Sequence, residues 1–188
     1  MTRFHVRLLN VKYNHIKTSV IVITKNRSTR LAKCLRSLAR QSTKPNEVIV
    51  IDSSDDHRSF PSGINGLSII YRHAPQYSIP VARQAGLELA RFPNTLFLDD
   101  DCIAPTDWLK KMLNLSQKYP RAALIAGRLT HSPARSIYAQ IISDLRKKRL
   151  LQAGCAGYLY FNIENCLIRK SFIIKHRIKF DESMLHED

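Results

Sequence analysis

The sequence lacks any apolar run close to the roughly 20 residues that cross a bilayer, and its first ten residues are too polar for the apolar core of a signal peptide. We therefore expect a cytoplasmic protein. Its four cysteines include no CxxC pair, which argues against a zinc site and for free thiols. No glycine-rich phosphate loop is present, neither GxGxxG nor GxxxxGK[ST], so dinucleotide and P-loop binding are not expected.

Negative charge is scarce. Fifteen Asp and Glu residues oppose thirty Lys and Arg residues, which gives a formal net charge of +15. Such a surface attracts anions, and charge alone leaves three partners open: nucleic acid, an acidic membrane leaflet and a phosphate-bearing small molecule. The cations gather at 146–149 and more loosely at 169–179. Each of these clusters can equally be a solvated helix face.

The chain has 188 residues, of which 44% are apolar, and this allows one domain with its own core. Short β-branched runs alternate with helical patterns, which predicts an α/β three-layer sandwich with a mostly parallel central sheet. We expect a basic leader at 1–17 and a single domain at 18–188. Strands are predicted at 19–24, 47–52, 67–71, 95–98, 122–126, 158–161 and 166–168, and helices at 28–41, 80–91, 107–118, 138–151 and 170–176, with Ser28 and Thr106 as the N-caps of the first and third helices.

Three consecutive aspartates, Asp99, Asp100 and Asp101, directly follow an apolar strand. Adjacent carboxylates repel one another, so they need a cation or hydrogen-bond donors beside them. A hard divalent metal, Mg²⁺ or Mn²⁺, would meet that need, because it prefers oxygen ligands and is often held by one or two carboxylates and substrate phosphates. The alternative is a turn, or a group of acids that caps the next helix.

Polar residues also stand where other predicted strands end. Thr24, Asp52 and Asp99 all lie at carboxyl ends, where ligands bind in open α/β sheets. Asp52 could accept a hydrogen bond from a base N–H or a ribose hydroxyl, and Thr24 and Asn26 offer short polar side chains. For Asp52 alone, a turn-forming role at a strand end is the alternative.

Four ordered motifs resemble those of family 2 glycosyltransferases with the GT-A fold. They are Val-Ile-Val-Ile-Thr-Lys-Asn-Arg at 20–27, Val-Ile-Val-Ile-Asp at 48–52, Val-Ala-Arg-Gln-Ala-Gly at 81–86 and Leu-Phe-Leu-Asp-Asp-Asp at 96–101, followed by Pro105 and Trp108. No single motif is decisive, but their order and spacing are fairly specific. The resemblance extends from about Thr18 to Asp188.

This resemblance implies a donor site, a metal site and a catalytic base. By this resemblance, the nucleotide would be held by Thr24, Asn26, Asp52 and Arg83, and Asp100 would touch the ribose or the sugar. Asp101 with Asp99 would bind Mn²⁺ or Mg²⁺. The general base would be Asp188, at the end of the acidic segment 180–188. Without the resemblance, Arg83 is equally a surface arginine and Asp188 a solvated chain end.

The predicted reaction is an inverting, metal-dependent transfer of a sugar from a UDP- or GDP-linked donor to a hydroxyl acceptor, such as a glycan or lipid-linked sugar, in glycan or polysaccharide synthesis. The metal would neutralise the departing diphosphate while a carboxylate takes the acceptor's proton. A single displacement implies inversion. The basic residues would attract the donor or dock the protein on the inner face of an anionic membrane.

The sequence departs from the family pattern at three places. Lys25 stands where many relatives carry an aromatic residue, Gln84 stands where asparagine is usual, and the chain ends at Asp188 where relatives generally continue into an acceptor-binding portion. A truncated, inactive transferase is therefore one alternative. Another is a basic α/β module that binds nucleic acid or another polyanion, although the aspartate triplet would repel a phosphate backbone. A nucleotidyltransferase ranks last, because the lysine-bearing glycine loop is missing.

Overall fold

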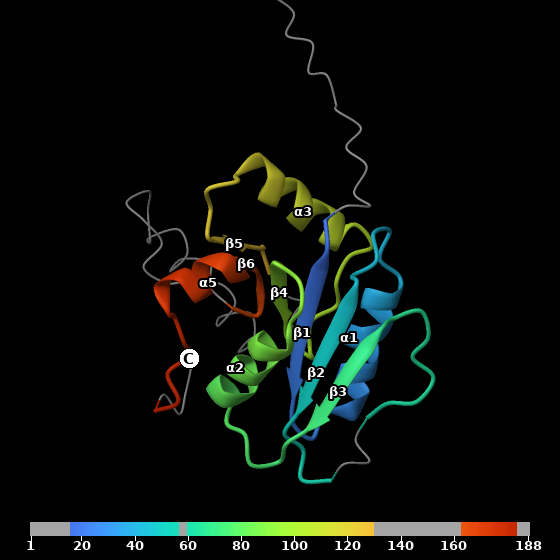
Figure 1. The fold of residues 1–188 in the computed structure, drawn as a ribbon. Coiled ribbons are helices and arrows are strands. Elements are labelled where there is room, and N and C mark those ends of the chain that lie inside the picture. The colour runs from blue at the N-terminus through green and yellow to red at the C-terminus, as the bar shows by residue number, and fades with distance from the viewer. Residues whose placement is uncertain (1–15, 57–59, 130–162, 184–188) are drawn as a thin grey trace, which may run out of the picture.

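A six-stranded sheet in the order β3-β2-β1-β4-β6-β5 forms the centre of the molecule (Figure 1). The computed structural model describes residues 16–56, 60–129 and 163–183. The predicted leader 1–17, apart from Ile16 and Lys17, and the predictions at 138–151, 158–161 and Asp188 lie outside these residues. The strands are β1 Thr18–Thr24, β2 Glu47–Asp52, β3 Ile69–His73, β4 Asn94–Leu98, β5 Leu124–Ala126 and β6 Asn165–Arg169.

Strand β1 is central and runs parallel to both of its neighbours. Ile21 lies opposite Ile49 of β2 and Phe97 of β4. β3 is parallel to β2, whereas β6 is antiparallel to β4 and to β5. The predicted mostly parallel sheet is confirmed, and its parallel strands end at one common edge.

Helices cover both faces of the sheet. α1 (Ser28–Ala39) and α3 (Trp108–Lys118) pack on one face, and α2 (Ile79–Leu89) and α5 (Lys170–His176) lie on the other (Figure 1). Side chains alternate along a strand, so Val20 and Val22 face α1 and α3 while Ile21 packs against α2. The two apolar layers confirm the predicted three-layer sandwich. No helix within 16–56, 60–129 or 163–183 is long and apolar enough to cross a bilayer.

Several local predictions were shifted. The strand expected at 67–71 occupies Ile69–His73, because its pairing follows β2 to the end and sets His73 opposite Asp52. Ser28 and Thr106 are not N-caps: Arg27 and Asp107 occupy those positions without a side-chain capping bond. In α1 the Arg27 carbonyl accepts hydrogen bonds from both Arg30 N and Leu31 N, so the first turn begins one residue earlier.

Gly86 allows α2 to approach the sheet closely. A Cβ added at this residue would lie 2.5 Å from Ile21 Cγ2, whose side chain is buried in β1. We expect Gly86→Ala to lower the free energy of unfolding by about 1–3 kcal/mol through overpacking, although alanine favours a helix by about 1 kcal/mol over glycine. Urea denaturation would measure the loss. Unchanged or increased stability would show that α2 can move away without cost.

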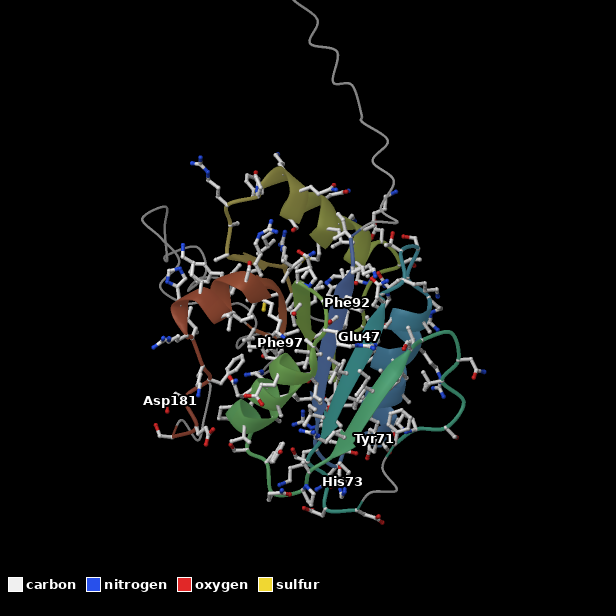
Figure 2. All side chains as sticks on the ribbon, viewed as in Figure 1. Glu47, Tyr71, His73, Phe92, Phe97 and Asp181 are labelled. Carbon is white, nitrogen blue, oxygen red and sulfur yellow. The ribbon has the colours of Figure 1, made fainter. Side chains whose placement is uncertain are left out.

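A buried carboxylate joins the beginnings of β1 and β2 to the end of α2. Glu47 is fully buried and accepts hydrogen bonds from Ser19 Oγ (2.7 Å), Arg91 N (2.8 Å) and Arg91 Nε (2.6 Å). In Figure 2 it lies near Phe92, whose N–H donates to Ser19 Oγ. Burial raises the pKa of Glu47, but the donors from Arg91 and Ser19 outweigh it, and the net pKa is lowered.

We expect Glu47→Gln to destabilise the fold by about 1–3 kcal/mol, because buried donors lose a charged acceptor. Since the folded pKa lies below the unfolded value of about 4.3, the stabilisation is complete above that pH and is lost as pH falls through the folded pKa. Urea unfolding of both proteins between neutral and acid pH should show the two stabilities converging in acid. Asp107→Asn, which removes an exposed pair with Lys111, is the control and should change little. A constant difference at every pH would contradict the assignment.

Candidate functional site

Polar residues gather where the parallel strands end. Thr24 and Asp52 are register partners at the carboxyl ends of β1 and β2, and Asp99 follows Leu98 at the end of β4. The loops after β1 and β2 are joined, because Ser53 N donates to the Thr24 carbonyl at 2.9 Å. The structure thus brings together residues that lie about 75 positions apart in the chain.

Asp100 points into this edge and is only 3% exposed. Its Oδ2 accepts a hydrogen bond from Thr24 Oγ1 at 2.6 Å, and its Oδ1 lies 3.4 Å from Arg27 Nη1. Burial raises the pKa of Asp100, and the Thr24 hydroxyl and Arg27 only partly offset this rise. Asp100 therefore ties the end of β4 to the turn that follows β1.

Asp99 faces α2, where Arg83 Nη2 lies 3.6 Å from its Oδ1 and Arg83 itself is 4% exposed. Burial raises the pKa of Asp99 to about 6, against the lowering effect of Arg83, and the carboxylates of Glu164, Asp101 and Asp100 add to the rise. Burial also lowers the pKa of Arg83, which Asp99 counteracts. The predicted donor-binding arginine is thus a buried partner of the triplet rather than a surface residue.

Asp101 is half exposed and turns toward solvent, with Arg30 Nη1 3.6 Å from its Oδ2. Each aspartate of the triplet therefore has its own arginine. Two of these arginines come from the start of α1 and one from α2. They are paired as Arg83 with Asp99, Arg27 with Asp100 and Arg30 with Asp101.

The oxygen donors of Asp99 and Asp101 suit a hard divalent cation. Within the parts of the chain that the structure describes, no three His, Cys, Asp or Glu side chains are grouped so that they could hold a metal by themselves. Mg²⁺ is usually held by one or two carboxylates together with waters and substrate phosphates. Burial raises the pKa of Asp99, and the neighbouring carboxylates of Glu164, Asp101 and Asp100 raise it further; a cation beside Asp99 would favour its charged form.

Asp52 forms the second half of the site. It is fully buried, its Oδ1 accepts from Ser54 N and its Oδ2 accepts from the Tyr71 hydroxyl, both at 2.9 Å. His73 Nε2 lies 2.7 Å from the Ser54 carbonyl oxygen, and Figure 2 shows Tyr71 and His73 toward the same end of β3. The carboxylate is thus fixed in place by the loop that follows it and by the edge strand.

Asn26 shapes the loop between β1 and α1. Its φ of 55° lies in the left-handed region, which asparagine tolerates better than most residues. Its backbone N donates to Ser54 Oγ at 2.7 Å, and its side chain exchanges hydrogen bonds with Asp55. In this structure Asn26 therefore positions two loops against each other.

Strand β6 brings Glu164 and Asn165 beside the triplet. Asp99 N donates to the Glu164 carbonyl at 3.1 Å, and Asn165 Oδ1 accepts from Trp108 Nε1 at 2.8 Å. Gly127 N donates to the Asn165 carbonyl at 2.7 Å, and a Cβ at Gly127 would meet the Asn165 side chain at 2.4 Å. Asn165 thus fixes the end of β5 and the start of α3 next to Asp99.

Sequence reasoning missed four residues of this site. Arg27 and Arg30 stand three positions apart just after β1, a spacing that places both at the start of one helix. Glu164 is the only acidic residue between Asp144 and Asp181, which is the signal that could have found it. Tyr71 gave no signal, because its role depends on strand pairing. Asp188 lies outside the described residues.

The glycosyl transferase family 2 model matches residues 19–177, which includes every described residue of this site. The chain belongs to glycosyl transferase family 2. The six-stranded, mostly parallel sheet with helices on both faces matches the GT-A fold.

Relatives and solved structures agree with this family. The succinoglycan biosynthesis protein ExoM of Rhizobium meliloti (strain 1021) is 32% identical over 114 residues, 56% of this chain and 37% of ExoM. The validoxylamine A glucosyltransferase of Streptomyces hygroscopicus subsp. limoneus is 29% identical over 103 residues, 50% of this chain and 22% of the enzyme. The crystal structure of S. aureus TarS 1-349 in complex with UDP-GlcNAc is similar in fold, with a TM-score of 0.65 and 19% identity over 92% of this chain and 50% of that TarS chain. This chain thus spans half or less of the length of these proteins.

The Thr24 hydroxyl should be important for holding Asp100 in place. We expect Thr24→Val, which keeps the shape but removes the donor, to cost about 1–3 kcal/mol of stability, and Thr24→Ser to restore most of it. Urea denaturation of the three proteins would measure this. A Thr24→Val protein as stable as the parent would mean that the carboxylate does not depend on this bond.

Proposed function

We propose that this chain binds a nucleotide-diphosphate sugar at the carboxyl edge of its sheet and serves as the donor-binding part of a glycosyltransferase in polysaccharide synthesis. The observation that carries the proposal is the set of three paired aspartates and arginines next to Thr24 and Asp52. Carboxylate oxygens, which suit a divalent cation, and guanidinium groups, which suit phosphate, thus lie within one small region. The family, the names of ExoM and the validoxylamine A glucosyltransferase, and the UDP-GlcNAc complex of TarS support it.

The nucleotide would lie along the β1–β2 half of the site. Asp52 would accept a hydrogen bond from a base N–H or a ribose hydroxyl in place of the one that its Oδ2 accepts from the Tyr71 hydroxyl, and Thr24, Asn26 and Arg83 would be the other donor-binding residues. Asp100, held inward by Thr24, would touch the ribose or the sugar. A UDP-linked donor is the first expectation, since UDP-GlcNAc is bound in the TarS structure.

Asp101, together with Asp99, would hold Mn²⁺ or Mg²⁺. When bound, the cation supplies positive charge that stabilises the departing diphosphate. Arg30 pairs with Asp101 and Arg83 pairs with Asp99, so positive charge lies beside both proposed metal ligands. Guanidinium groups bind phosphate oxygens with two parallel hydrogen bonds. The half-exposed Asp101 is the member of the triplet that is most accessible to an incoming ligand.

The acceptor chemistry completes the proposal. Asp188 would remove the proton from the acceptor hydroxyl as the new bond to the anomeric carbon forms. One carboxylate opposite one leaving group gives a single displacement with inversion. The acceptor would be a hydroxyl of a glycan or of a lipid-linked sugar.

A panel of nucleotide sugars tests the donor site. We expect one UDP- or GDP-linked sugar to raise the melting temperature of the protein in Mn²⁺ or Mg²⁺ and to do so much less in EDTA. A ligand at 100 times its Kd stabilises the folded state by about 2.7 kcal/mol. Asp101→Asn should abolish the metal-dependent part of the shift, whereas Asp107→Asn, an exposed acid outside the site, should keep it.

Measuring the release of UDP or GDP distinguishes binding of the donor from its turnover. Metal-dependent release of UDP or GDP, lost in Asp101→Asn, would support the transferase. Stabilisation by a donor without any release would show that the site binds the donor but does not hydrolyse it. No stabilisation by any donor, with tight and steeply salt-dependent binding of nucleic acid, would replace the proposal by a polyanion-binding module.

A further inference from the structure

We propose that the outer surface of α5 and the residues after it dock onto an anionic lipid bilayer. This α5 surface lies on the face of the sheet that α2 also covers, away from α1 and α3 (Figure 1). The proposal goes beyond the proposed function and does not depend on it. We define the α5 surface by three apolar and three basic residues, namely Phe172, Ile174, Ile178, Lys175, Arg177 and Lys179.

The apolar part of the α5 surface is unusually exposed. Phe172, Ile174 and Ile178 are 37%, 65% and 42% exposed, and none of the residues of α5 is buried. A seven-residue helix with so little burial gains little from packing on the sheet. Exposed apolar patches rimmed by polar residues mark interaction sites for proteins or membranes.

Backbone geometry places the basic residues among these apolar side chains. Arg177 adopts a left-handed conformation with φ 51°, and Ile178 N donates to the Ile173 carbonyl at 3.0 Å. The helix therefore ends at His176, and this bond keeps Ile178 next to its last turn. Lys175, Arg177 and Lys179 are all exposed, as is His176 between them.

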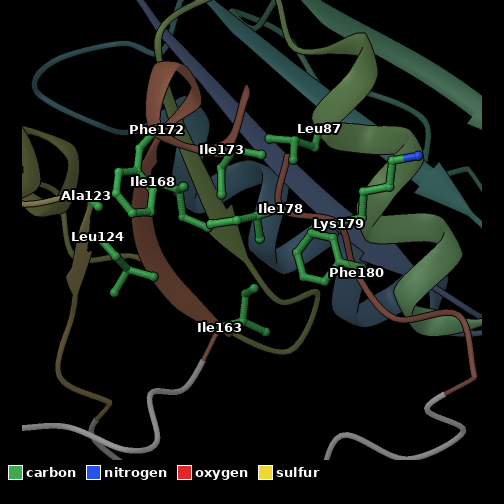
Figure 3. A pocket seen from close by; sticks show the side chains of 10 residues that line it. All are labelled: Leu87, Ala123, Leu124, Ile163, Ile168, Phe172, Ile173, Ile178, Lys179 and Phe180. Atoms are coloured by element: carbon green, nitrogen blue, oxygen red, sulfur yellow. The ribbon is translucent and has the colours of Figure 1, made fainter. Parts of the chain in front are cut away.

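An apolar cavity of about 280 Å³ lies beneath the α5 surface (Figure 3). Leu87 of α2, Ile173 of α5 and Phe180 after it contribute to its wall, and among the described residues that line it Lys179 is the one with a charged side chain. Figure 3 shows Phe172 and Ile178 at the same cavity. Apolar volume and positive charge thus occur side by side.

The combination of apolar and basic residues indicates which partner binds the α5 surface. An anionic phospholipid offers both an acyl chain for the apolar residues and a negative headgroup for the cations. A nucleic acid offers negative charge and bases that stack on aromatic rings, but no acyl chain for the aliphatic side chains of Ile174 and Ile178. Glu88 of α2, and Asp181 and Glu182 after the turn, bring some negative charge to the border of the surface, so the contact is centred on α5 rather than on the turn.

Vesicle sedimentation of the full chain tests the proposal. We expect binding to phosphatidylcholine vesicles that contain phosphatidylglycerol and little binding to phosphatidylcholine alone. Phe172→Ser/Ile174→Ser should weaken binding at least tenfold. Lys175→Glu/Lys179→Glu should weaken it by more than the roughly fivefold per cation that an anionic surface provides.

Helix α3 offers matched controls on the opposite face of the sheet. Its Leu115 and Tyr119 are 37% and 50% exposed, and Lys110 and Lys118 are exposed cations. Leu115→Ser/Tyr119→Ser and Lys110→Glu/Lys118→Glu should leave vesicle binding within about twofold of the parent protein if binding is local to α5. Melting temperatures verify that each variant is folded, and Ile174→Ser alone, at the most exposed position, replaces the double variant if that fails to fold.

Three results would overturn the proposal. The first is no binding to anionic vesicles. The second is equal loss in the α3 and α5 variants, or loss with the charge variants alone, which would indicate unspecific attraction to anions. The third is a stable dimer that Ile174→Ser dissociates, without vesicle binding, which would make the α5 surface a contact between copies of this chain.

Discussion

Charge compensation at the end of β4 is the constraint on which the rest of the site depends. Three successive carboxylates directly follow a buried strand, and two of them are largely buried. Their repulsion is offset by guanidinium groups that arrive from α1 and α2. The turn after β1, the packing of α2 and the end of β4 must therefore be in place together, because a displaced helix would leave a buried charge without compensation.

The central strands were predictable because their residues are buried on both faces and therefore read as continuous β-branched runs. β2 was found at its predicted bounds, and β1 begins one residue earlier than expected. β3 was displaced by two residues because it is an edge strand, with half-buried side chains that give a weaker pattern. The N-caps of α1 and α3 were each misplaced by one residue, since Ser28 and Thr106 have the right chemistry for a cap but Arg27 and Asp107 occupy the cap positions.

Sheet order was beyond the reach of sequence reasoning. β6 pairs in an antiparallel sense between β4 and β5, and this contact joins residues about 40 to 75 positions apart. The aspartate triplet could be recognised from composition and from its place after a strand. The partner of each aspartate could not, because Arg30 meets Asp101 only through the orientation of α1 and Tyr71 meets Asp52 only through strand register.

The pairing of β5 with β6 also fixes the surroundings of Asp99. Gly127 N donates to the Asn165 carbonyl, and Asn165 follows Glu164, whose carbonyl accepts from Asp99 N. A Cβ at Gly127 would meet the Asn165 side chain at 2.4 Å. Any residue larger than glycine at position 127 would therefore push Asn165 and shift the backbone that holds Asp99 at the end of β4.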